Sequence, residues 1–386
     1  MKFIDLSAQQ KRIRHKIETN ILKVLDHGQY IMGPEVGVIE ENLGEFVGAK
    51  HAISCASGTD ALLMALMAYN IGPGDAVFTT PFTFIATAEV ISLLGATPIF
   101  VDIDPNTFNI DPEQLEKAIK AVKFGSANFP LPKTENALPL TPKGVIAVDL
   151  FGLPADYDII NTIADQNGLF VIEDAAQSFG AEYKGKKACS LADIACTSFF
   201  PAKPFGCYGD GGMCFTNDDK LAEIMESIRV HGKGSDKYDN IRIGINGRLD
   251  TIQAAILLTK FDIFPDEIRL RQIVADRYAM HLSGLSFPVT PNIPSEMTSA
   301  WAQYSILASD EIQCLLLQTK LKDEGIPTAI YYPTPLHLQT AFKPLGYREG
   351  SFPESEDISQ RIFSLPMHPY LSEEEQKKIA KVMHSG

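Results

Sequence analysis

Between residues 51 and 174, short apolar runs alternate with stretches that have helical periodicity. We expect strands at residues 51–55, 75–80, 97–103, 144–150 and 169–172, and helices at residues 61–69, 85–94 and 157–165. Strands that alternate with helices in this way are typical of a mostly parallel sheet covered by helices. The rhythm therefore predicts an α/β fold with a mostly parallel sheet sandwiched by helices.

The flanking segments predict a second, smaller unit. An amphipathic helix is expected before residue 27, because apolar residues recur there at helical spacing. Beyond about residue 263, frequent prolines indicate shorter strands and helices. We predict a large domain at residues 1–262, which includes the N-terminal helix, and a small C-terminal α/β domain at residues 263–386. Residues 123–143, which have no clear period, are expected to form a surface insertion.

Charge and cysteine content exclude several classes of protein. A net charge of −14 argues against a nucleic-acid partner, which would call for a basic patch. No apolar run suits a signal peptide or reaches the roughly 20 residues of a membrane helix, so no membrane contact is expected. The six cysteines show no zinc-site spacing, and we expect no metal. They are typical of reduced, mostly buried thiols in a cytoplasmic protein.

Lys203 is the first candidate for chemistry. It lies between two prolines, and Phe199 and Phe200 precede it. Pro204 keeps Lys203 out of helical dihedrals, and apolar neighbours suggest that the side chain is partly buried. Burial lowers the pKa of a lysine, and a neutral amine suits Schiff-base chemistry. The alternative is an ordinary solvated lysine.

Three further features suggest a phosphorylated ligand. Gly58 and Thr59 occupy a strand-to-helix turn, where free amides favour an anion, although an ordinary helix cap has the same sequence. Asp174 ends an apolar strand, and a carboxylate buried there needs either a protonated ring nitrogen or an arginine as its partner. Ser198 ends another strand and could donate to a phosphate.

Phe84 follows a strand and could stack on a ring, although a phenylalanine in that place is more often part of the core. Together with Lys203, the anion site and Asp174, it completes the set of groups that pyridoxal 5′-phosphate (PLP) requires. No one of these features is specific by itself.

Several motifs together give the chain a resemblance to a known family. They are GQYIMGPEV (28–36), SGTDAL (57–62), FTFIAT (82–87), VIEDAAQS (171–178), SFFPAKPFGCYGDGG (198–212), NGRLD (246–250) and YPTPLH (332–337). With these motifs the chain closely resembles, over nearly its whole length, the DegT/DnrJ/EryC1/StrS family of sugar aminotransferases. These are PLP enzymes with the aspartate-aminotransferase fold, called fold type I, and the resemblance implies a mostly parallel, mixed sheet of the seven-stranded type.

The resemblance implies roles for individual residues. Lys203 would hold the cofactor as a Schiff base and later move the proton between the cofactor and the sugar carbon. Asp174 would keep the pyridine nitrogen protonated, and Gln177 would reach the phenolic oxygen of the ring. Phe84 would stack on the ring, and the phosphate would be bound by Gly58, Thr59 and Ser198.

The resemblance also implies a homodimer with shared active sites. In this family an asparagine equivalent to Asn246 reaches the phosphate site of the neighbouring subunit. Arg248 would then meet an anionic group of the substrate or amino donor across the interface. A salt bridge from Arg248 to Asp250 at a helix start is the alternative, and the sequence leaves both open.

The activity implied is amino transfer from L-glutamate to a UDP-linked keto 2-acetamido sugar, for surface-polysaccharide or O-antigen biosynthesis. Either C3 of a 3-keto uronic acid or C4 of a 4-keto-6-deoxy sugar is the acceptor, and Arg248 would suit a uronate carboxylate. Tyr331, which stands where some uronate-acting relatives carry histidine, and His337 are further candidate substrate contacts. Dehydration is a rival reaction, although dehydratase relatives replace the lysine, and a non-enzymatic PLP or nucleotide-sugar sensor is a second rival.

Overall fold

The computed structural model describes residues 1–386 except residues 126–128, 134–138, 237, 286, 288 and 385–386. The strands are β1 (His51–Cys55), β2 (Asp75–Thr79), β3 (Thr97–Phe100), β4 (Thr141–Val148), β5 (Phe170–Asp174), β6 (Glu182–Tyr183), β7 (Lys186–Lys187), β8 (Ile194–Ser198), β9 (Gly212–Thr216), β10 (Met297–Thr298), β11 (Tyr304–Leu307) and β12 (Ile362–Leu365). The α-helices are α1 (Leu6–His27), α2 (Pro34–Val47), α3 (Gly58–Ala68), α4 (Ala86–Leu93), α5 (Pro112–Phe124), α6 (Tyr157–Asn167), α7 (Asp219–Arg229), α8 (Thr251–Phe261), α9 (Phe264–His281), α10 (Glu311–Asp323), α11 (Pro353–Arg361) and α12 (Glu373–His384). Short 3-10 helices are η1 (Leu150–Gly152), η2 (Leu336–Leu338) and η3 (Thr340–Leu345).

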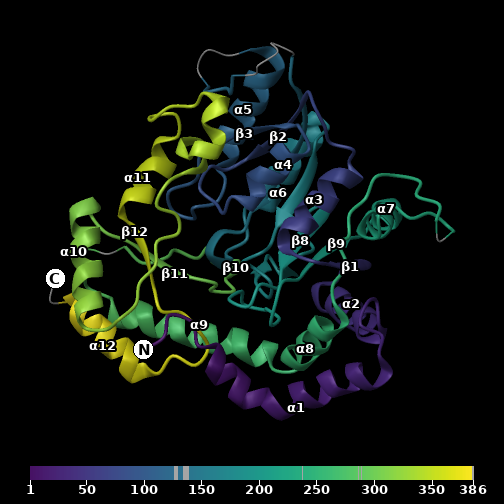
Figure 1. Cartoon of the computed structure of the whole chain (residues 1–386). Coiled ribbons are helices and arrows are strands. Elements are labelled where there is room, and N and C mark those ends of the chain that lie inside the picture. Colours follow the sequence, from purple (N-terminus) through teal and green to yellow (C-terminus); the bar gives the residue numbers. More distant parts are fainter. Residues whose placement is uncertain (126–128, 134–138, 237, 286, 288, 385–386) are drawn as a thin grey trace.

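A seven-stranded sheet in the order β1-β9-β8-β5-β4-β2-β3 forms the centre of the large unit (Figure 1). The pairs β3/β2, β2/β4, β4/β5 and β5/β8 are parallel, and β9 is antiparallel to both β8 and β1. Residues 199–211 join β8 to β9 without a crossover helix, so β9 returns antiparallel beside β8. The predicted seven-stranded, mostly parallel mixed sheet is therefore confirmed.

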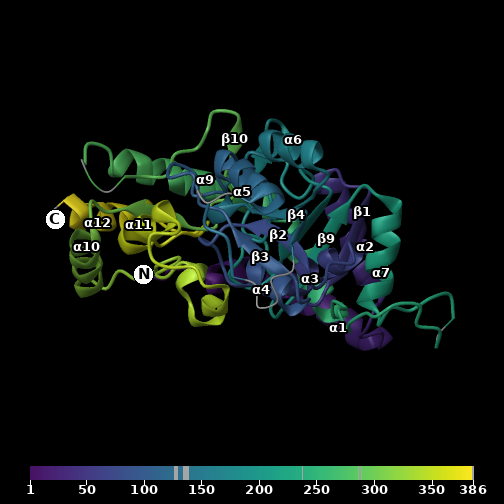
Figure 2. The ribbon, with the colours of Figure 1, turned by 90° about the horizontal axis from the view of Figure 1, so that it is seen from above.

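Helices cover both faces of this sheet. Figure 2 shows α5 and α6 on one side and α3 and α4 on the other. Each strand contributes apolar side chains to both faces of the sheet, because successive side chains point in opposite directions. In β9, Met213 and Phe215 pack in the apolar cluster with α2 and α8, while Cys214 between them packs in the cluster with α3.

A smaller unit contains the antiparallel pair β11/β12, which packs with α9, α10 and α12. Helix α9 connects the two units, because Phe264 at its start packs in the core under the large sheet and Tyr278 near its end packs in the small core. The first residues of the chain also lie against the small unit, where Met367 N donates to Phe3 O at 3.1 Å. The division at residue 263 stays a prediction, since both units share α9.

Two strands differ from the sequence prediction by three residues at one end. Strand β3 ends at Phe100 instead of continuing to residue 103. Beyond it, the carboxylate of Asp102 accepts from the amides of Glu354 and Ser355, each at 2.9 Å, and so caps the start of α11. Strand β4 begins at Thr141, inside the range predicted as a surface insertion, and ends at Val148 instead of residue 150.

The predicted insertion at residues 123–143 falls partly on residues 126–128 and 134–138, which lie outside the described part of the chain. Of its described residues, Phe124 ends α5, and Lys133 N donates to Leu345 O at 2.7 Å. All six cysteines are free and buried, as their sequence context predicted. Among the described helices, none has the length and apolar character needed to cross a membrane.

The close contact between β4 and β5 gives a test of the fold. A Cβ atom placed on Gly144 would lie 2.1 Å from Cε2 of Phe170, and the Phe170 ring is stacked on Tyr69 with the ring centroids 4.0 Å apart. We expect Gly144→Ala to lower the free energy of unfolding by about 1–3 kcal/mol through overpacking, measured by chemical denaturation.

Gly37→Ala is the matched control, because Gly37 lies in α2 and a Cβ there meets no atom within 4 Å. It should leave the free energy of unfolding unchanged or raise it by up to about 1 kcal/mol. Equal stability of the two variants would contradict the packing argument.

Candidate active site

Lys203 lies in the loop that follows β8. Two backbone hydrogen bonds close this loop: Phe199 N donates to Gly211 O and Cys207 N donates to Phe199 O, both at 2.7 Å. The Lys203 side chain is half-buried, and Phe199 is buried beneath the loop while Phe200 is exposed. Burial lowers the pKa of Lys203, and the charge of Asp174 opposes this shift. Lys203 is therefore not a fully solvated surface lysine.

Asp174 ends β5 and is 6% exposed. Its Oδ2 accepts from Thr87 Oγ1 at 2.8 Å, and its Oδ1 accepts from Ala176 N at 3.3 Å. Burial raises the pKa of Asp174, while the bond from Thr87 and the charge of Lys203 act against this shift. Across the described residues no ion pair includes Asp174, so the arginine partner that the sequence left open is not found.

Thr87 was not singled out from the sequence, although it closes the FTFIAT motif. It lies in the first turn of α4, which follows β2, and Asp174 comes 87 residues later at the end of β5. The sequence shows only that Thr87 lies in the same motif as Phe84. That position does not predict a hydrogen bond to a carboxylate in a distant strand.

The start of α3 has unpaired amides. Ser57 is the N-cap, and its Oγ accepts from Asp60 N at 3.0 Å. The amides of Gly58 and Thr59 have no hydrogen-bond partner in the described part of the chain. A Cβ on Gly58 would lie 2.6 Å from Cβ of Ser198, so glycine allows β8 to approach the helix start. The structure therefore brings Gly58, Thr59 and Ser198 together, and the Ser57 cap leaves the two amides free.

Gln177 and Phe84 lie near the side chain of Tyr332. Gln177 Oε1 accepts from Phe151 N at 2.7 Å, and its Nε2 donates to the Tyr332 hydroxyl at 3.3 Å. The Phe84 ring is 54% exposed and lies 6.5 Å from the Tyr332 ring, so Phe84 is not a core residue. Tyr332 is a neighbour that the sequence did not single out. The contact of Gln177 with a ring oxygen stays a prediction, and one N–H of its amide remains for it.

Asn246 and Arg248 lie together in the segment that follows α7. Arg248 Nε donates to Asn246 Oδ1 at 3.0 Å, and Gly247 O accepts from Ala56 N at 3.0 Å. Asn246 is exposed and Arg248 is half-buried. Within the described ranges no ion pair joins Arg248 to Asp250, so the helix-start alternative for Arg248 is not found.

Tyr331 and His337 are the two remaining candidate substrate contacts. Tyr331 is half-buried, and its ring lies 6.4 Å from that of Phe3 and 5.8 Å from that of Tyr332. His337 is 1% exposed, its Nε2 lies 2.9 Å from Glu356 Oε1, and its ring packs on Phe352. These contacts give His337 a packing role, which does not support the predicted contact with substrate; that contact stays a prediction.

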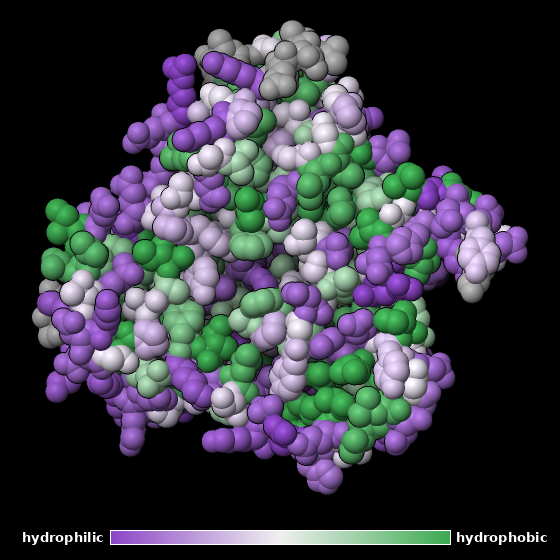
Figure 3. Space-filling view, in the orientation of Figure 1, coloured by the Kyte–Doolittle hydropathy of each residue, from purple (hydrophilic) through white to green (hydrophobic). Residues whose placement is uncertain are grey.

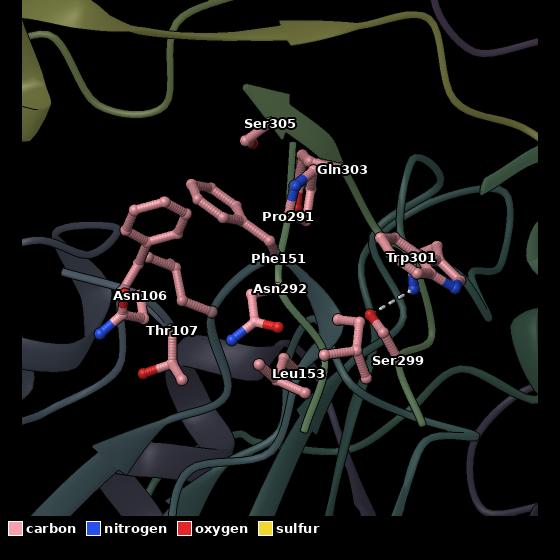
Figure 4. A pocket seen from close by; sticks show the side chains of 13 residues that line it. Asn106, Thr107, Phe151, Leu153, Pro291, Asn292, Ser299, Trp301, Gln303 and Ser305 are labelled. Atoms are coloured by element: carbon pink, nitrogen blue, oxygen red, sulfur yellow. Dashed lines mark hydrogen bonds between the residues drawn. The ribbon is translucent and has the colours of Figure 1, made fainter. Parts of the chain in front are cut away.

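A small pocket lies beside Phe151, whose amide donates to Gln177 Oε1 (Figure 4). Its walls come from residues 106–108, from η1 and from residues 291–305 of the chain. Ser299, which accepts from Trp301 N at 3.0 Å, lines the same space. None of the sequence-predicted site residues lines this cavity, so it is separate from the group around Lys203.

Comparison with known proteins identifies relatives of the whole chain. The sequence model described as the DegT/DnrJ/EryC1/StrS aminotransferase family matches residues 11–384. The UDP-2-acetamido-2-deoxy-3-oxo-D-glucuronate aminotransferase of Pseudomonas aeruginosa is 50% identical over 371 residues, which are 96% of this chain and 96% of that protein.

Two solved structures share the fold. The crystal structure of a DegT DnrJ EryC1 StrS aminotransferase from Brucella abortus has a TM-score of 0.93 and 50% identity, and covers 100% of this chain and 99% of that one. The PMP-form of the putative sugar aminotransferase Spr1654 from Streptococcus pneumoniae has a TM-score of 0.86 and 25% identity, with 96% of each chain covered.

The bond from Thr87 to Asp174 generates a test of the site. A hydrogen bond to a charged group contributes about 1.5–3 kcal/mol, so Thr87→Val should weaken the binding of PLP to the apo-protein about tenfold or more. A titration of the apo-protein with PLP, followed by absorbance, measures the dissociation constant.

Thr79→Val is the control, because the buried hydroxyl of Thr79 has no hydrogen-bond partner among the described residues. Its dissociation constant for PLP should match that of the unmodified protein. If the Thr87→Val protein binds PLP as tightly as this control, then Thr87 does not contribute to PLP binding through Asp174.

Proposed function

The chain belongs to the DegT/DnrJ/EryC1/StrS aminotransferase family, and from this membership we propose that it transfers the amino group of L-glutamate to C3 of a UDP-linked 2-acetamido-3-keto uronic acid. Its activity is that of a PLP-dependent nucleotide-sugar aminotransferase. The observation that carries the proposal is the buried carboxylate of Asp174, which lacks an ion-pair partner among the described residues and faces the half-buried Lys203.

The residues present fit PLP. A protonated pyridine nitrogen would supply the positive charge that Asp174 lacks, since a buried unpaired carboxylate is costly. The free amides of Gly58 and Thr59, with the Ser198 hydroxyl beside them, suit a phosphate. Phe84 exposes a ring that can cover the face of an aromatic cofactor. PLP, when bound, supplies an electron sink and an aldehyde that carries the amino group.

Each of these side chains then has a task in amino transfer. Lys203 moves a proton to and from the reacting carbon, and burial favours the neutral amine that accepts it. Asp174, kept in place by Thr87, holds the ring nitrogen protonated. Gln177 is fixed by Phe151 N and can donate its remaining N–H to the ring oxygen. Phe84 and Tyr332 exclude water from one side of the reacting groups.

The relative from P. aeruginosa supports a uronate as the acceptor and C3 as its position, since its name specifies a 3-oxo-glucuronate. Arg248 provides a guanidinium that can bind a carboxylate with two parallel hydrogen bonds. A 4-keto-6-deoxy sugar has no carboxylate to offer Arg248, and we place it second. Such an amino sugar would serve surface-polysaccharide or O-antigen biosynthesis.

We extend the proposal to a homodimer with shared active sites. The segment that follows α7 projects from the body in Figure 1. In it Ile241 and Ile243 are 55% and 86% exposed, and Asn246 and Arg248 stand at its base, where Gly247 N donates to Arg229 O at 3.0 Å. Figure 3 shows a second apolar area over the end of α1 and the start of α2, where Leu22 is 57% exposed. Burying such surfaces stabilises association, and a partner packed against this segment would bring its own site toward Asn246 and Arg248.

Amino transfer is tested by spectroscopy and product mass. With PLP bound, the protein should show the visible absorbance band of a Schiff base with Lys203, and addition of L-glutamate should remove this band. Incubation with the 3-keto uronate should give a product with an added amino group, whereas a dehydratase would release water.

Lys203→Ala should abolish the band and reduce turnover by several orders of magnitude, while the surface variant Lys117→Ala keeps both. If the unmodified protein binds the nucleotide sugar but does not convert it, the result would favour the alternative of a non-enzymatic sensor.

The shared site is tested by mixing two inactive variants. Lys203→Ala removes the amine and Asn246→Ala removes the group proposed to cross the interface. If each site uses both chains, a mixed dimer contains one site with neither change and one with both. Activity should therefore rise after mixing, toward about a quarter of the unmodified level when subunits exchange at random. Activity that stays at the level of the separate variants would place Asn246 in its own subunit's site.

A further inference from the structure

Helix α8 packs against the loop that carries Lys203, and one of its side chains is a second buried lysine. Lys260 stands in the last turn of α8 and is 1% exposed. Lysine is rarely buried to this degree, because removing an ammonium group from water is costly. In the described part of the chain no ion pair includes Lys260. Neither core packing nor a salt bridge therefore explains why a lysine stands here.

The Lys260 amine faces the loop between β8 and β9. Its Nζ donates to Gly206 O at 2.5 Å and lies 4.4 Å from the centre of the Tyr208 ring. The negative face of an aromatic ring attracts a cation. Burial lowers the pKa of Lys260 to about 8, although the charge of Glu267 opposes this shift, so the amine is mostly protonated at pH 7. Two groups of one loop thus hold the buried cation.

A second side chain of α8 contacts the same loop. Gln253 Oε1 accepts from Tyr208 N at 3.0 Å. Gln253 lies about two helical turns before Lys260, so both side chains are on one face of α8. A Cβ on Gly209 would lie 2.8 Å from Gln253 Nε2, so the glycine leaves room for this amide beside the loop. Helix α8 therefore holds the loop both at Gly206 O and at Tyr208 N.

The part of the loop held in this way closes the turn that contains Lys203. A Cβ on Gly206 would lie 2.4 Å from Phe200 O, so the two ends of the turn are packed backbone to backbone. Phe200 O accepts from Lys203 N at 2.9 Å, and Cys207 N donates to Phe199 O. The two prolines of the turn restrict its backbone further. The position of the Lys203 backbone thus depends on where α8 holds Gly206.

Helix α8 is a firm support for this loop, because it is packed between two other helices. Ile256 packs with Ile13 of α1, and Leu257 lies in the apolar cluster shared with α2. Asn20 Nδ2 of α1 also donates to Thr259 Oγ1 at 2.8 Å. The loop is therefore attached to a helix that is fixed on its other sides.

We propose that Lys260 is a positioning residue, which holds Gly206 O from α8 and so sets the place of the Lys203 amine, with Gln253 as a second support. Lys260 acts through the loop and needs no contact with the cofactor or the substrate. An apolar residue in its place would leave the buried Gly206 O without this partner and would loosen the turn. An amine that must reach a fixed point on a bound ring reacts less well when its backbone can shift. This inference rests on the role proposed for Lys203.

Hydrogen exchange of the apo-protein, followed by mass spectrometry of its fragments, tests this support without the cofactor or the sugar. Lys260→Met keeps most of the side-chain length and removes the N–H groups. The fragment that contains residues 199–211 should then exchange at least about tenfold faster, while β4 and β5 keep their rates. Unchanged exchange in this fragment would overturn the proposal. So would an equal acceleration in every strand, because that result reports a loss of overall stability.

Two further variants sharpen the exchange experiment. Thr259→Ala is the matched control, because it removes the bond to Asn20 on the α1 side of α8 and should leave the exchange of residues 199–211 unchanged. If it accelerates this fragment as strongly as Lys260→Met does, the assignment to Lys260 is wrong. If Lys260→Met does not fold, Gln253→Ala should still accelerate the fragment, since the Tyr208 amide loses its acceptor. An unchanged rate in Gln253→Ala would then contradict the support of the loop by α8.

The binding of two forms of the cofactor provides a second readout. PLP can form a covalent bond with Lys203, whereas pyridoxamine 5′-phosphate (PMP), which has an amine in place of the aldehyde, cannot. Lys260→Met should therefore weaken the binding of PLP about tenfold or more and change the dissociation constant of PMP by less than about twofold. Equal weakening of both ligands would indicate a damaged pocket instead of a displaced amine and would overturn the proposal. No change in either would do the same.

Lys203→Ala separates this inference from the proposed function. If Lys203 forms the covalent bond, this variant should also lose affinity for PLP and keep its affinity for PMP. A Lys203→Ala protein that binds PLP as tightly as the unmodified protein would refute the role proposed for Lys203. The exchange rates of Lys260→Met do not depend on that outcome, because they are measured without the cofactor.

Discussion

A buried carboxylate without a protein cation is the constraint on which the site depends. Asp174 lies at the carboxyl end of a central strand, supported by Thr87 and by one backbone amide. Burying a charge in this way is unfavourable unless a positive partner completes the site. The fold supplies Lys203 nearby, whose own pKa is lowered by burial. The two residues therefore shift each other's charge state, which suits a site for a ring that carries a proton.

The antiparallel return of β9 places these groups together. Lys203 stands in the loop between β8 and β9, and Ser198 at the end of β8 approaches the start of α3. A Cβ on Gly58 would collide with Ser198, and a Cβ on Gly212 would lie 2.4 Å from Ser57 O. Two glycines thus let three chain segments meet where the helix amides are free. The same approach would not be possible with larger residues.

The sequence singled out the main candidate residues of the site but not the contacts that support them. Lys203, Asp174 and the start of α3 could be predicted because each stands at the end of an element that periodicity reveals. Thr87 and Tyr332 could not, since each reaches the site only through tertiary packing. His337 was predicted as a substrate contact from a motif, but its ring is buried against Phe352. A motif carries no information about which way a side chain points.

The sequence by itself determined the order of strands and helices, the mixed sheet and the family, because these follow from local periodicity and from motifs that lie within single segments. Only the tertiary structure decided which polar groups share a partner. Glu173 accepts from Leu191 N and Asp149 from the Ser178 hydroxyl, and Asp149 N reaches Asp174 O because β4 and β5 are adjacent and in register. Whether a buried acid is charged depends on donors from distant segments, such as Leu191 and Ser178, and their positions are fixed only when the chain has folded.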